Sequence, residues 1–229
     1  MKRLWKRPPI LIPSLLLVLA GMLLSGSVHA APPAGSSDPV AAATAGLSSL
    51  KSMATQAGYA SFGFQSAAEV SKAKLGGPIS TYMIEYDELK ALAPTADPKT
   101  ALHDLKERIF PVFVGGAARA AITVRQQADG TWQVVSMGNA QTVKLLEGAK
   151  AAHGKSTGKK HEYMLITIPA LYQMFLAHTD GAGKLHFVTM VKDKALGSTG
   201  SGQARPARTV LDLLTKLAKD SKPLAKPAP

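Results

Sequence analysis

The chain has 229 residues, a formal net charge of +12 at pH 7 and no cysteine. Without cysteine it forms no disulfide, thiolate zinc site, iron–sulfur cluster, thiol nucleophile or lipid-modified N-terminal cysteine. The basic residues are concentrated in the first nine residues, in four lysines between residues 150 and 160, and in the segment 192–229, which has eight basic and three acidic residues. The rest of the chain is close to neutral, which argues against a broad nucleic-acid groove, and we expect no nucleic-acid partner.

The first thirty residues have the three parts of a secretory signal peptide. Basic residues precede an apolar run over 10–24, and Val28-His29-Ala30 fits a small-residue cleavage pattern. The apolar run has about fifteen residues and contains Pro13, so it is short for a membrane span, which needs about twenty. We therefore predict a signal peptide over 1–30 and no transmembrane span after its cleavage, with an uncleaved N-terminal anchor as the alternative. Export without disulfides suits a periplasmic or secreted bacterial protein.

Helix signals dominate the region after the predicted cleavage site. Residues 31–39 have the composition of a linker, and apolar residues at helical spacing predict a helix over 40–56. Ser66 and Glu69 fit a capping box for a short helix over 67–75.

A second helix start is formed by Asp97, a capping residue, and Pro98, which is favourable in the first helical position. The apolar residues that follow recur with a helical period and predict an amphipathic helix that reaches residue 109. They are Ala101, Leu102, Leu105 and Ile109.

Alternating apolar residues predict a strand over 79–86 and two antiparallel groups of strands, over 110–137 and 162–191. Gly115-Gly116 and Asp129-Gly130 are tight-turn dipeptides within the first group. A helix from Asn139 to about residue 152 is expected between the groups. These elements form a domain over 40–192.

The predicted fold class is α+β, with a largely antiparallel sheet of about six strands, helices packed on one face, and a C-terminal amphipathic helix. We expect a flexible linker over 193–208, the amphipathic helix over 209–220, and a disordered tail over 221–229. The sequence leaves open whether this helix docks on the domain or binds a partner.

A candidate metal site surrounds the turn between the last two predicted strands. His178 and His186 flank this turn and are expected to face each other across a hairpin, with Asp180 beside them. Histidine and aspartate are ligands of zinc and other divalent ions. The other histidines after the signal peptide are expected to be exposed, and they are His103, His153 and His161.

Two further sets of residues are candidates for binding. Exposed lysines form a basic loop, and three tyrosines are possible edges of an apolar pocket on an open sheet. The lysines are Lys155, Lys159 and Lys160, and the tyrosines are Tyr82, Tyr86 and Tyr172.

The sequence favours a non-enzymatic binding or accessory protein of the cell envelope, which uses its basic loop and tail for contacts. We expect no cofactor, and the expected partner is an envelope protein or an anionic envelope surface. The alternatives are a metal-assisted hydrolase at the His/Asp cluster and a carrier of small apolar ligands.

Overall fold

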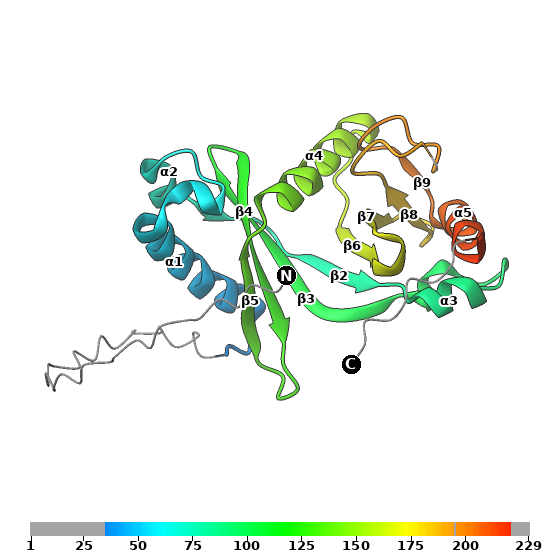
Figure 1. Cartoon of the computed structure of the whole chain (residues 1–229), viewed down its shortest axis with the longest axis horizontal. Helices are drawn as coiled ribbons and strands as arrows, with labels where there is room; N and C mark the ends of the chain where they lie inside the picture. The colour runs from blue at the N-terminus through cyan, green and yellow to red at the C-terminus, as the bar shows by residue number, and fades with distance from the viewer. Residues whose placement is uncertain (1–34, 195, 221–229) are drawn as a thin grey trace, which may run out of the picture. The chain divides into compact units, whose positions relative to one another are not determined.

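The computed structural model describes residues 35–194 and 196–220; the predicted signal peptide, residues 31–34 and the tail 221–229 lie outside them. Within the described residues, nine strands form one sheet in the order β5-β4-β3-β2-β6-β7-β8-β9, with β1 paired to β3 (Figure 1). The pairs are antiparallel except β2 and β6, which are parallel. The strands are β1 (Lys74–Leu75), β2 (Ile79–Met83), β3 (His103–Val114), β4 (Ala117–Gln126), β5 (Trp132–Gly138), β6 (Tyr163–Ile168), β7 (Gln173–Thr179), β8 (Leu185–Val188) and β9 (Ala204–Pro206). The α-helices are α1 (Pro39–Ala57), α2 (Ala67–Ser71), α3 (Tyr86–Ala91), α4 (Ala140–Thr157) and α5 (Ala207–Asp220), and the 3-10 helices are η1 (Tyr59–Phe62), η2 (Pro98–Ala101) and η3 (Pro169–Leu171).

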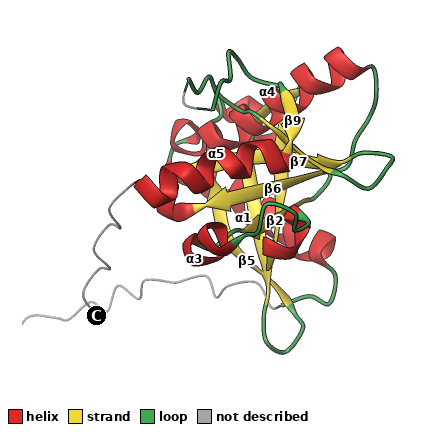
Figure 2. Ribbon diagram, turned by 90° about the vertical axis from the view of Figure 1, so that its right-hand side faces the viewer, coloured by secondary structure: helices red, strands yellow, loops and turns green. Residues whose placement is uncertain are grey.

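The predicted α+β class is confirmed, because helices accompany a large and mostly antiparallel sheet and the chain's last described element is a helix. The structure differs from the prediction in the number of strands and in the placement of the helices. Along β7, Phe175 and Ala177 pack in a cluster with α5, whereas Leu176 between them packs with α4. Successive side chains of a strand point to opposite faces, so the helices cover both faces of the sheet rather than one. Figure 2 shows α5 in front of the sheet, and its buried residues share one hydrophobic cluster with residues of β6, β7 and β8.

The first helices begin where the sequence signals place them, but α2 ends at Ser71 rather than at residue 75, because Lys74–Leu75 pairs with β3 as a strand. Asp38 caps α1, and its carboxylate accepts hydrogen bonds from the backbone N–H groups of Val40 and Ala41. The Ser66 hydroxyl accepts a hydrogen bond from the N–H of Glu69 at the start of α2, and the Glu69 carboxylate accepts one from the preceding chain. The buried face of α1 packs on β3, β4 and β5, which closes the hydrophobic cluster at that end of the sheet.

The predicted amphipathic helix up to residue 109 is wrong. Asp97 does cap a helical turn, but only η2 follows, and the chain is a strand from His103 onward. Lys106 has φ 55°, and the pairing of β3 with β2 shifts register beside it. This bulge interrupts the two-residue alternation, so the apolar spacing imitates a helix. Pairing with neighbouring strands on both sides outweighs the local helical pattern.

The segment 193–208, which we expected to be a flexible linker, packs on the domain. Leu196 and Ser198 are both 2% exposed, and β9 pairs with β8. The helix that follows is docked, which answers the question that the sequence left open. The Tyr86 hydroxyl donates a hydrogen bond to the carbonyl of Ala218 at 2.6 Å, and the Thr215 hydroxyl donates one to a carbonyl of α3 at 3.1 Å. Among the described residues, no helix is both long and apolar enough to cross a membrane.

Candidate functional site

A row of three ring side chains crosses the second half of the sheet. Tyr163 on β6 is the register partner of His178 on β7, which is in turn the partner of His186 on β8. These side chains lie on the same face as the apolar residues two positions along each strand, and that face packs against α4. The apolar residues are Leu165, Leu176 and Val188, which cluster with Leu146 and Ala149 of α4.

Two further histidines approach this row from outside the sheet. His153 comes from the last turns of α4, and His161 comes from the loop between α4 and β6. The ring centroid of His178 lies 4.3 Å from that of His161, 4.7 Å from that of His153 and 5.3 Å from that of His186. The rings of His153 and His161 are 5.0 Å apart. We call these four side chains the histidine cluster.

The expectation that His153 and His161 are exposed is wrong. His153 is 2% exposed, and His161 is partly buried. The sequence does carry a signal for His153, because it follows Leu146 and Ala149 at the spacing of one helix face. The predicted helix ends at about residue 152, whereas α4 continues to Thr157 and includes His153. No local pattern identifies His161, whose position depends on the path of the loop.

Three members of the histidine cluster have hydrogen-bonding partners. His186 Nε2 lies 2.9 Å from Asp180 Oδ2, and the Nδ1 atom of His153 lies 2.9 Å from the hydroxyl of Tyr163. Nε2 of His161 is 3.4 Å from the hydroxyl of Thr157. Asp180 is held in the turn between β7 and β8 by two backbone N–H groups, which donate to Oδ1 at 2.9 and 2.8 Å.

His178 is the exception. The residue is 5% exposed, and within the described residues neither ring nitrogen has a hydrogen-bonding partner of good geometry. The backbone of Thr179 is close enough to oppose the lowering of the ring's pKa, but it does not form such a bond. A buried polar group without a partner costs about 1–3 kcal/mol of stability, so such groups are uncommon in folded proteins. Unpartnered ring nitrogens of this kind are available to a ligand.

Burial favours neutral rings at two members of the cluster, His153 and His178. Burial lowers the pKa of His178 to about 4, and the neighbouring rings of His161 and His153 add to the effect. Burial also lowers the pKa of His153. Neutral imidazole is the form that ligates metal ions, so an ion need not compete with protonation of His153 or His178 at pH 7.

The cluster is not already arranged around an ion. In residues 35–194 and 196–220, no three His, Asp or Glu side chains hold their donor atoms in a geometry that fits one metal ion. The rings are packed against one another, with His178 and His186 stacked at an interplanar angle of 11°. Coordination would require the rings to move from these positions.

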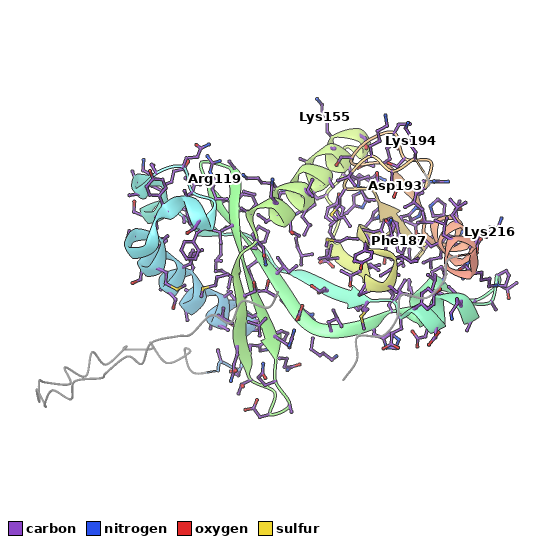
Figure 3. The ribbon with its side chains drawn as sticks, viewed as in Figure 1. Arg119, Lys155, Phe187, Asp193, Lys194 and Lys216 are labelled. Atoms are coloured by element: carbon purple, nitrogen blue, oxygen red, sulfur yellow. The ribbon has the colours of Figure 1, made fainter. Side chains whose placement is uncertain are left out.

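The candidate lysines lie near the cluster, on its helix side. Lys159 and Lys160 line a hollow of about 390 Å³ together with His161 and Tyr163. We call it the lysine hollow, and its other lining residues are Glu147, Lys150, Ala151 and Gly154. Lys155 is exposed and is not among the lining residues; Figure 3 shows its side chain extending away from α4.

The three candidate tyrosines are separated by their surroundings. Tyr82 and Tyr86 pack against the hydrophobic cluster under α5, whereas Tyr172 is 84% exposed after η3. The stacked rings of Phe175 and Phe187 lie in the same cluster and are buried. The aromatic face that we considered for an apolar ligand is therefore covered by α5.

Comparison with known proteins identifies no relative: no protein-family model, no curated protein and no solved structure matches this chain. The functional argument therefore depends on the geometry of the histidine cluster.

Proposed function

We propose that this protein binds a divalent transition-metal ion at the histidine cluster. The observation that supports the proposal best is His178, a buried side chain with two unpartnered ring nitrogens in contact with three other histidines. A fold retains a destabilising group of this kind where it serves a function. The four rings, with Asp180 beside His186, supply the donors.

The donor set selects the class of ion. Four imidazoles with one nearby carboxylate suit Zn²⁺, Ni²⁺ or Cu²⁺, whereas Ca²⁺ and Mg²⁺ prefer sites made of oxygen atoms. The chain has no cysteine, so thiolate coordination does not contribute. Among these ions, the ordinary affinity order for nitrogen ligands places Cu²⁺ highest.

The site would act in the cell envelope. This part of the proposal depends on the first thirty residues, which have the basic, apolar and cleavage regions of a signal peptide. We propose a binding or accessory role, because metal binding by clustered imidazoles does not require a reaction.

Titration of the metal-free purified protein with Zn²⁺, Ni²⁺ and Cu²⁺ in a calorimeter tests the proposal. We expect one ion per chain and a loss of affinity of at least 10-fold in His178→Leu. The matched control is His103→Leu, which removes a histidine on β3 whose partner is Glu88 and which lies outside the cluster. Equal affinity of the His178 and His103 variants, with both folded by circular dichroism, would refute the site; so would the absence of binding in the parent protein.

A further inference from the structure

The lysine hollow adjoins the histidine cluster through two shared side chains. His161 and Tyr163 line the hollow, and the same residues contact the ring of His178 or its neighbour His153. Its volume of about 390 Å³ is in the range of sites for small molecules.

The charge of the hollow is positive. Three lysines and one glutamate line it, and that glutamate, Glu147, pairs with Lys150 at 2.8 Å. Lys159 and Lys160 are exposed, and neither forms an ion pair with a carboxylate in the described part of the chain. Two lysines without a carboxylate partner in the described residues therefore line the hollow together with Tyr163.

Such lysines are unfavourable neighbours for a bare metal cation, because like charges repel. An anion bound in the hollow would change the net interaction between the hollow and the metal ion from repulsive to attractive. It would be attracted by the lysines and by the ion, and it would in turn stabilise the ion. Coupling of this kind is reciprocal, so each ligand tightens the binding of the other by the same factor.

We propose that the lysine hollow binds a small multivalent oxyanion, a phosphate or a dicarboxylate, and that this anion and the metal ion bind cooperatively. The cooperative part rests on the proposed function, whereas anion binding by the hollow does not. Oxygen atoms of such anions accept the charge-assisted hydrogen bonds that lysines donate. The hollow is open to solvent, and its volume of about 390 Å³ suits a free small anion.

The test measures binding of inorganic phosphate and of malonate to the purified protein, metal-free and loaded with Ni²⁺. In the metal-free protein, we expect the double variant Lys159→Gln/Lys160→Gln to lose at least 5-fold in affinity. The matched control, Lys155→Gln/Lys194→Gln, removes two exposed charges that do not line the hollow and should bind as the parent does. In the loaded protein, we expect both anions to bind at least 5-fold more tightly.

Each contrary result has a separate meaning. Equal losses in the two double variants would show general charge attraction and would overturn the hollow as a site. Lysine-dependent anion binding without tightening by Ni²⁺ would overturn the coupling. If the protein binds no metal but keeps lysine-dependent anion binding, the proposed function fails while the anion site stands. Binding to vesicles containing phosphatidylglycerol, with no binding of free phosphate or malonate, would overturn the small-anion assignment.

Discussion

Replacement of His178 by leucine should stabilise the metal-free protein. The residue is 5% exposed, and its two ring nitrogens have no hydrogen-bonding partner of good geometry in the part of the chain that the structure describes. Leaving a buried polar group unpartnered costs about 1–3 kcal/mol, and leucine removes this cost at nearly the same volume. Imperfect packing of the leucine side chain lowers the free energy of unfolding, typically by less than about 1.5 kcal/mol, and so offsets part of this gain. We expect a net increase of about 1 kcal/mol in the free energy of unfolding.

Urea unfolding at pH 7 in the presence of a chelator measures this change. A gain of about 1 kcal/mol raises the melting temperature of a domain of this size by about 2–4 °C. The comparison variant is His153→Leu, which removes the partner of the Tyr163 hydroxyl and should lose about 0.5–1.5 kcal/mol. A loss of more than 1 kcal/mol in His178→Leu would refute the reasoning, since it would mean that the ring contributes to stability without a ligand.

Three further predictions follow from particular contacts. In the metal-free protein, the pKa of His178 is about 4, below the value of about 6.5 in the unfolded chain. As pH drops from about 6.5 toward 4, the unfolded state therefore binds a proton that the folded state does not, and the free energy of unfolding falls by up to about 3 kcal/mol. The difference between the urea midpoints at pH 7 and pH 4.5 should be smaller in His178→Leu than in the parent protein. Gly202→Ala should cost at least about 1 kcal/mol in thermal unfolding, because φ is 82° and a Cβ would lie 2.5 Å from that of Ala152; an unchanged melting temperature would contradict this contact. Tyr86→Phe should cost about 1 kcal/mol by removing the hydrogen bond to Ala218, and limited proteolysis should cut α5 faster than in the parent.

Elements defined by local chemistry were predictable from the sequence. The cap at Ser66 and Glu69 forms as expected, and Gly115 and Gly116 both have positive φ in the tight turn between β3 and β4. Each of these signals depends on residues a few positions apart. The sequence also placed His178 and His186 on opposite sides of one hairpin, where the register pairs them.

The rest of the site depends on contacts between distant segments, which a single sequence does not specify. His153 reaches His178 only because α4 packs across β6 and β7, and His161 does so only through the path of its loop. The bulge at Lys106 likewise hides β3, since it disturbs the alternation by which a strand is recognised. In β3, pairing with neighbouring strands outweighs the local periodicity; at the histidine cluster, the packing of distant segments decides which side chains meet.

The parallel pair between β2 and β6 has a consequence for the order of folding. The neighbouring hairpins close short loops, whereas this pair joins residues 79–83 to residues 163–168 across three strands and α4. Closing a long loop costs chain entropy before its contacts form, so we expect this pairing to be a late and slow step. Three of the clustered histidines, His161, His178 and His186, lie in the half of the sheet that begins with β6. The fourth, His153, is carried by α4, which packs on β4 in the other half. The full histidine cluster, and with it the proposed metal site, should therefore assemble during refolding only when the two halves of the sheet join.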